Sequence, residues 1–220
     1  MEKRILSIPV NGISVPGDLT LCNPVDKLVI FAHGSGSSRN SIRNKSVVTA
    51  LNKKGISTLL FDLLSEDEAA SIPNRFNIPK LTRRLITATN WLLEQKEVKS
   101  ASIGYFGAST GAAAALAASI ECPEVSTVVS RGGRPDLILH ELHQIHIPVL
   151  FIVGENDQDV LSLNQKAFDL LKGKKELISI PGASHLFEEK GKLEKVTEIA
   201  ENWFMKHLEK KKKGVAVRYE

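Results

Sequence analysis

Short apolar runs alternate with longer segments of helical period along most of the chain. The apolar runs lie at residues 27–32, 56–61, 101–106, 125–130, 147–153 and 176–180. The segments of helical period lie at residues 41–54, 79–97, 109–120, 136–144, 161–171 and 188–208. Strands that alternate with helices in this way predict an open α/β sheet that is mostly parallel and buried on both faces.

The N-terminal region has a different pattern. Residues 3–10 and 13–22 flank Asn11-Gly12, which is a strong hairpin signal, so we expect two antiparallel strands there and eight strands in all. The segment 63–78 is the one long connection without a clear pattern. We expect it to be too short to form a lid domain. Ligands of such sheets bind beyond the carboxyl ends of the strands, so the loops at those ends hold the candidate chemistry.

One of these loops is Gly107-Ala108-Ser109-Thr110-Gly111, which follows a strand-like run and precedes an Ala-rich helical one. Glycine two positions before and after Ser109 relieves the crowding of a tight strand-to-helix turn, and the hydroxyl then projects at the helix N-terminus as a nucleophile. The alternative is a glycine-rich turn whose serine caps the helix. The pentapeptide alone is weak, but a nucleophile requires an acid and a histidine further along the chain.

Both required residues are present, in the order Ser, Asp, His. Asp157 follows the apolar run 147–153, and His185 follows the run 176–180. His185 would accept the serine proton, and Asp157 would fix the imidazole tautomer. Asp136 and Asp159 are rival acids, and we expect Asp159 near the start of the next helix. The rival histidines are His33, His140, His143, His146 and His207. The spacing of His140, His143 and His146 could suggest a metal, but no further ligand accompanies them, and we expect none.

The loop Ala32-His33-Gly34-Ser35-Gly36-Ser37-Ser38-Arg39 lies at another strand end. Acyl transfer needs two backbone N–H donors for an oxyanion, and we assign them to Ser35 and Thr110. The loop lacks the spacing of a P-loop or a dinucleotide site, so phosphate binding is the weaker interpretation. Arg39 and Arg131 could reach the mouth of the site and bind an acidic group of the substrate. Equally, Arg131 could pair with a structural acid such as Asp62 or Asp136.

With these residues in place, the chain resembles the α/β-hydrolase superfamily, in its dienelactone-hydrolase-like branch. The resemblance covers residues 3–208 and rests on FAHGSGSSRNSIRN, GYFGASTG, SRGGRPD, IVGENDQDV and PGASHLFEE. It implies an α/β-hydrolase fold and a triad of Ser109, Asp157 and His185. Members that open dienelactones use a cysteine nucleophile, whereas this chain has Ser109, so the resemblance implies ester hydrolysis rather than lactone opening. Some serine-type members of the branch are fused to a phosphoribosyltransferase.

Composition predicts the cellular location of the protein and argues against nucleic-acid and membrane partners. The net charge of +4 equals that of residues 206–220, where six Lys or Arg oppose two Glu, so the basic pI reflects a solvated tail rather than a nucleic-acid or membrane surface. Cys22 and Cys122 lack metal spacing and are interpreted as reduced core thiols. Neither a signal-like segment nor a membrane span is found. We expect a cytoplasmic protein that needs no cofactor and could form a homodimer.

We therefore predict one hydrolase domain at residues 1–208 and a basic C-terminal tail at residues 209–220. The predicted activity is that of a serine hydrolase that cleaves small carboxylic esters or thioesters through an acyl-enzyme. An acyltransferase would use the same triad and deliver the acyl group to another acceptor. A non-catalytic binding protein on the same fold would be expected to have lost a triad residue. A peptidase is a further alternative, but its relatives usually carry an additional domain.

Overall fold

A single sheet of eight strands organises the computed structural model, which describes residues 1–208. The strands are β1 (Glu2–Val10), β2 (Ile13–Leu21), β3 (Lys27–Ala32), β4 (Ser57–Phe61), β5 (Ser102–Ala108), β6 (Val125–Arg131), β7 (Val149–Gly154) and β8 (Lys175–Ile180). Their order across the sheet is β1-β2-β4-β3-β5-β6-β7-β8. β1 and β2 form an antiparallel hairpin, and β2 also pairs antiparallel with β4. The six strands from β3 to β8 are parallel, as the sequence predicted.

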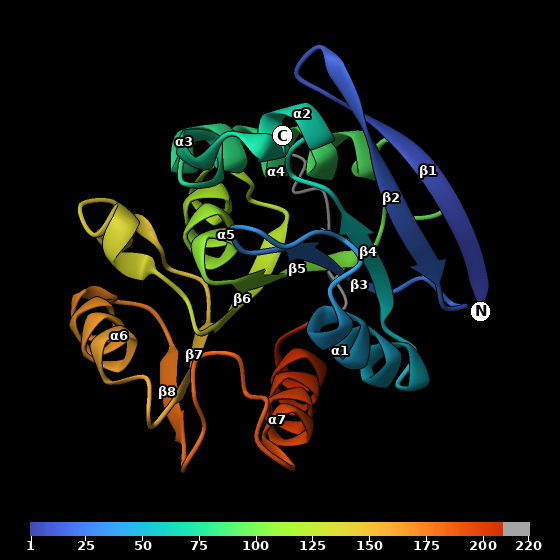
Figure 1. Ribbon diagram of the computed structural model, residues 1–220. Coiled ribbons are helices and arrows are strands. Elements are labelled where there is room, and N and C mark those ends of the chain that lie inside the picture. The colour runs from blue at the N-terminus through green and yellow to red at the C-terminus, as the bar shows by residue number, and fades with distance from the viewer. Residues whose placement is uncertain (209–220) are drawn as a thin grey trace, which may run out of the picture.

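Helices cover both faces of this sheet (Figure 1). α1 (Ile42–Lys53) and α7 (Lys192–His207) pack together on one face. The other face carries α4 (Ile78–Leu93), α5 (Thr110–Glu121) and α6 (Gln158–Leu170). Each face buries its own apolar core, with Leu51, Phe106 and Phe204 on the first and Leu85, Leu116 and Phe151 on the second. The predicted α/β-hydrolase architecture is therefore confirmed.

The Ala-rich helix α5 is the most deeply buried of the helices. Every residue from Thr110 to Ser119 is buried, because six alanines and one glycine present little bulk to the sheet and to α4. Alanine also has the highest helix propensity, so this sequence favours the helix and a close approach at once. The first turn of α5 is thereby held directly against the carboxyl ends of the central strands.

Two segments differ from the sequence prediction. The connection at 63–78 contains two short helices, α2 (Glu66–Ala70) and α3 (Ile72–Arg75), where we expected no regular structure. α2 begins with a capping box of Ser65 and Glu68, a local signal that the absence of apolar periodicity concealed. At 136–144 the expected helix is replaced by two 3-10 helices, η1 (Pro135–Ile138) and η2 (Leu142–Gln144). The two 3-10 helices bury Ile138 and Leu142, whose spacing is similar to that of buried residues in an α-helix, and this explains why the apolar pattern predicted an α-helix.

Several smaller expectations concern the remainder of the chain. Cys22 and Cys122 are both buried and free, as expected. Among residues 1–208, the helices are all too short or too polar to cross a membrane. The predicted basic tail at residues 209–220 lies outside the described residues.

Candidate active site

Ser109 occupies a tight corner between β5 and α5. Its φ of 51° and ψ of −121° place a non-glycine residue in a sparsely populated region, at a cost of about 1–3 kcal/mol. The flanking glycines make the corner possible. A Cβ on Gly107 would lie 2.4 Å from Ala112 Cα, and a Cβ on Gly111 would lie 2.3 Å from the Ala32 carbonyl oxygen. These backbone angles would suit a nucleophile elbow, and the Ser109 side chain makes no capping bond.

His185 and Asp157 are in direct contact. The imidazole Nδ1 lies 2.6 Å from Asp157 Oδ2, and the two side chains are 39% and 16% exposed. A carboxylate can only accept, so Nδ1 carries the proton and donates it to Asp157. Nε2 is then the basic nitrogen, and it has no hydrogen-bond partner within residues 1–208. The pair is therefore arranged for an imidazole that accepts a proton on Nε2.

The loops that carry this pair are joined by backbone contacts. Asn156 donates its N–H to the Ala183 carbonyl at 2.9 Å, and Glu155 donates to the Ile180 carbonyl at 3.0 Å. A Cβ on Gly154 would lie 2.3 Å from the same Ala183 oxygen, so only glycine permits this approach. The two loops therefore form one rigid unit, which keeps the histidine and the acid in register.

The backbone after β6 connects this unit to the serine. Ser109 donates its N–H to the Arg131 carbonyl at 3.2 Å, and the next residue is Gly132, at φ 52°. A Cβ on Gly132 would lie 3.4 Å from Cε1 of His185, so the imidazole ring packs against the Gly132 backbone. The structure thus brings Ser109, Asp157 and His185 to one corner of the sheet. No hydrogen bond joins Ser109 Oγ to His185 Nε2 in this structure.

His33 fixes the loop that follows β3. Its ring is 8% exposed and spans two backbone groups, Gly34 O at 3.0 Å from Nδ1 and Leu63 N at 3.0 Å from Nε2. Nδ1 must donate and Nε2 must accept, so the ring is neutral. Burial lowers the pKa of His33 below its ordinary value of 6.5, which favours the same form. His33 is thus a structural histidine rather than a rival base.

The two backbone donors assigned from the sequence, Ser35 and Thr110, lie on either side of this corner. Thr110 is the first residue of α5, so its N–H has no intrahelical acceptor. Ser35 lies inside a turn closed by a bond from Ser37 N to Gly34 O at 3.1 Å. Within residues 1–208, neither N–H has an acceptor. A Cβ on Gly34 would lie 3.0 Å from Ser109 Cβ, so the loop lies directly against Ser109.

A pocket of about 150 Å³ opens next to these donors. Its lining comes from the loop after β3, the segment after β4, α4 and α5, and consists of His33, Gly34, Ser35, Gly36, Ser37, Leu64, Ala69, Arg75, Leu81 and Thr110. A cavity of this size accommodates a group about as large as benzene.

The two arginines that the sequence suggested for the substrate do not line this pocket. Arg39 binds Asp62 through its backbone N–H and its guanidinium, both at 2.7 Å, which ties the loop after β3 to the end of β4. Arg131 is 6% exposed and donates to Asn44 at 3.2 Å, so neither acid weighed as its partner contacts it. Burial, with nearby Arg43, lowers the pKa of Arg131 to about 10. Both side chains serve internal contacts, which corrects the substrate role expected for Arg39 and favours the structural alternative for Arg131, with Asn44 as its partner.

Arg75 is the arginine that lines the pocket, and sequence reasoning missed it. It ends α3, where its Nε donates to the Ala69 carbonyl, and it forms no ion pair within residues 1–208. It belongs to the segment whose short helices the apolar pattern did not show. The capping box of α2 was the available local signal.

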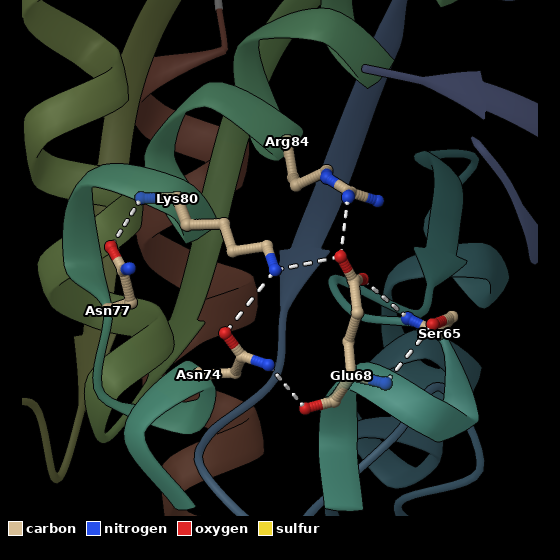
Figure 2. A network of polar contacts seen from close by, with 6 residues as sticks. All are labelled: Ser65, Glu68, Asn74, Asn77, Lys80 and Arg84. Atoms are coloured by element: carbon tan, nitrogen blue, oxygen red, sulfur yellow. Dashed lines mark hydrogen bonds and ion pairs between the residues drawn. The ribbon is translucent and has the colours of Figure 1, made fainter. Parts of the chain in front are cut away.

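Glu68 anchors this segment to α4 (Figure 2). Its Oε1 accepts from Lys80 at 2.8 Å and from Arg84 at 2.9 Å, and its Oε2 accepts from Ser65 N at 3.1 Å. Burial opposes ionisation, but the bonds from Lys80 and Ser65 leave the pKa of Glu68 below its ordinary value. Asn74 contributes a bond to the Glu68 carbonyl at 3.0 Å. We call residues 65–77 the pocket wall.

The rival site residues lie elsewhere. Asp136 forms a two-bond ion pair with Arg134, at 2.8 and 2.7 Å, and Asp159 is exposed in the first turn of α6, as expected. The histidines at 140, 143 and 146 are exposed. Among the described residues, no cluster of His, Cys, Asp or Glu could hold a metal ion.

Comparison with known proteins places this chain in a family. Residues 43–210 match the model of the dienelactone hydrolase family. A crystal structure of a dienelactone hydrolase from Anabaena variabilis is 44% identical, with a TM-score of 0.90 over 94% of this chain and 99% of that one. Est1E from Butyrivibrio proteoclasticus is 17% identical, with a TM-score of 0.79 over 92% of this chain and 98% of that one, and shares the fold.

Curated relatives from two Mycobacterium tuberculosis strains are 50% identical over 94% of this chain, and their names give a provisional phosphoribosyl transferase. The chain spans 46% of the length of these relatives. The family match covers well over half of the chain, and the Anabaena structure matches almost end to end. This chain belongs to the dienelactone hydrolase family.

Proposed function

We propose that this protein is a serine hydrolase that cleaves small carboxylic esters or thioesters through an acyl-enzyme on Ser109. The observation that carries the proposal is the elbow geometry of Ser109 at the corner where the His185–Asp157 pair lies. A serine that merely caps a helix would need neither the unfavourable backbone angles nor an adjacent histidine with a free Nε2.

The proposed reaction follows from the position of each group. Ser109 Oγ attacks the acyl carbon while its proton passes to His185 Nε2, and Asp157 stabilises the imidazolium. The carbonyl oxygen becomes an oxyanion, for which the N–H groups of Ser35 and Thr110 are the proposed donors. Collapse expels the alcohol or thiol, which takes the proton from His185. Water then enters, loses a proton to the same nitrogen and releases the acid.

The volume of the pocket suggests the size of the acyl group that it can bind. Leu64, Ala69 and Leu81 supply apolar lining, and the volume of about 150 Å³ suits a short acyl group. An acyl chain that extends beyond the pocket gains nothing from its exposed methylenes, each of which forgoes about 0.8 kcal/mol of burial. We therefore propose that short acyl esters are turned over at least as well as long ones.

A fluorophosphonate probe followed by a panel of acyl esters tests the proposal. We expect labelling of Ser109 in the wild-type protein, and we expect Ser109→Ala to lose both labelling and a factor of about 10⁴–10⁶ in turnover without losing its fold. Ser71→Ala is the matched control, because the Ser71 hydroxyl makes no capping bond in the pocket wall. An active Ser109→Ala variant contradicts the elbow assignment. Transfer to added alcohols in preference to water would instead favour an acyltransferase.

Arg75 leads to a second test, on substrate charge. A charge-assisted contact between its guanidinium and a distal carboxylate is worth about 1.5–3 kcal/mol. We expect Arg75→Gln to lower kcat/KM for esters with a distal carboxylate by about 10–100-fold and to leave neutral esters nearly unchanged. Arg83→Gln removes an exposed charge from α4, outside the pocket lining, as a control. Equal losses on acidic and neutral esters would show that Arg75 only supports the pocket wall.

A further inference from the structure

The hydroxyl of Thr110 is buried without a partner at the edge of the pocket. The residue is 1% exposed, and its Oγ1 makes no hydrogen bond to residues 1–208. Threonine in the first turn of a helix usually bonds a nearby backbone group or points to water. Thr110 does neither, although a buried hydroxyl without a bond destabilises the folded state. The structure therefore keeps a costly group at this position.

The position of Thr110 suggests an acceptor. It directly follows Ser109, it lines the pocket, and its own N–H is one of the two proposed oxyanion donors. The N–H and the hydroxyl belong to one residue, and that residue lines the pocket beside Ser109. The opposite side is formed by the loop of Gly34 and Ser35, which contacts Ser109 Cβ. A carbonyl oxygen held between these groups would supply the acceptor that the protein lacks.

We infer that Thr110 is a catalytic residue whose side-chain hydroxyl donates a third hydrogen bond to the oxyanion during acyl transfer. This inference rests on the proposed function and adds a side-chain donor to its two backbone donors. The hydroxyl keeps its proton throughout. As Ser109 Oγ bonds to the acyl carbon, the carbonyl π electrons move to oxygen, and the Thr110 O–H bond points at the charge that develops there. Donors aimed at this charge act on kcat rather than on substrate binding.

Replacement of Thr110 by valine separates this role from a structural one. Valine has nearly the shape of threonine and removes a buried hydroxyl that bonds nothing, so the folded state should keep or gain stability. We expect Thr110→Val to keep or raise Tm, to lower kcat for a short ester by about 10²-fold, and to leave KM within roughly twofold of wild type. Thr110→Ser restores the hydroxyl and should recover most of kcat.

Thr82 provides a matched control within the same molecule. It is also buried, and its Oγ1 also lacks a partner among the described residues, but it lines a separate groove formed by α4, α5 and η1. Thr82→Val should therefore behave as Thr110→Val does in thermal unfolding and leave kcat unchanged. The pair of variants distinguishes the loss of a catalytic donor from the general effect of a threonine-to-valine change.

The experiment measures kcat, KM and Tm for the four proteins, together with fluorophosphonate labelling of Ser109. A selective loss of kcat in Thr110→Val, recovered in Thr110→Ser, supports the inference. Labelled wild-type protein with an unchanged kcat in Thr110→Val overturns the inference and leaves the proposed function standing. A loss of Tm in Thr110→Val also overturns it, because the hydroxyl would then be structural. Wild-type protein that neither labels nor hydrolyses esters overturns both.

Discussion

The corner that holds Ser109 and the pocket wall at residues 65–77 border the same pocket but are held in place by different means. At the corner, main-chain segments pack closely against each other, and added Cβ atoms at Gly107 or Gly111 would lie less than 3 Å from main-chain atoms. The pocket wall consists of two short helices without a buried residue, held by the charged side chains around Glu68 (Figure 2).

This difference matches what each region has to do under the proposed function. A chemical step tolerates only displacements well below an ångström between the reacting groups. Close backbone packing supplies that precision because it has no alternative arrangement. A surface that recognises the substrate needs less positional precision. The side chains that form its ion pairs can be substituted without changes to the sheet. We therefore expect substitutions at the corner to affect kcat or folding, and substitutions in the pocket wall to affect KM.

The largest expected effect concerns the corner that holds Ser109 and the His185–Asp157 pair. Asp157→Asn should lower turnover by about 10⁴-fold, because an asparagine favours the wrong imidazole tautomer. Asp159→Asn and Asp136→Asn are the controls, since Asp159 is exposed and Asp136 pairs with Arg134. Both should stay within roughly tenfold of wild type in a steady-state ester assay. Greater sensitivity at Asp136 would place the acid after β6 and contradict the assignment.

A smaller effect, on stability, tests the backbone packing itself. Gly111→Ala places a Cβ 2.3 Å from the Ala32 carbonyl oxygen, so we expect a loss of about 3 kcal/mol in the free energy of unfolding. Gly104→Ala is the matched control, because its Cβ would meet a side chain, the Phe204 ring at 2.8 Å, rather than the main chain. Denaturant unfolding should show the greater loss at Gly111. Equal losses would mean that the corner relaxes as readily as a side-chain contact.

The contrast between the two regions also explains what the sequence could predict. β3 begins at Lys27 and ends at Ala32, as the apolar run at 27–32 predicted. Asp157 and His185 also follow their strands as expected, because chain order and apolar runs determine which loops meet. The partners of Arg39 and Arg131 and the place of Arg75 in the pocket were not predicted, for one shared reason. The sequence shows that an arginine is present, but its partner, Asp62, Asn44 or the open pocket, depends on side chains brought together only by the fold.

The next effect tests the side-chain anchor of the pocket wall. Glu68→Gln removes the charge that Lys80 and Arg84 share, and Arg84 is only 5% exposed. We expect a loss of about 1–2 kcal/mol in unfolding free energy and a several-fold rise in KM with kcat nearly retained. Asp67→Asn on the same helix removes an exposed acid as the control. A fall in kcat with unchanged KM would show that the pocket wall and the corner that holds Ser109 act as one unit.

The smallest effect comes from His33, which bridges Gly34, beside the corner, and Leu63, two residues before the pocket wall. Burial lowers its pKa in the folded protein below 6.5, so below that pH the unfolded chain binds the proton more readily. Stability from His33 is therefore complete above about pH 6.5 and is lost as the pH falls toward the folded-state pKa. The slope cannot exceed about 1.4 kcal/mol per pH unit for one proton.

Denaturant unfolding at several pH values measures this slope. We expect His33→Gln to be less stable than wild type at neutral pH and to lose less stability between about pH 7 and pH 5, because glutamine does not titrate. His143→Gln removes an exposed histidine and should keep the wild-type slope. An unchanged slope in His33→Gln would mean that the acid sensitivity originates elsewhere. Parallel loss of ester turnover and stability in wild type below pH 6.5 would indicate that the loop after β3 depends on a neutral His33.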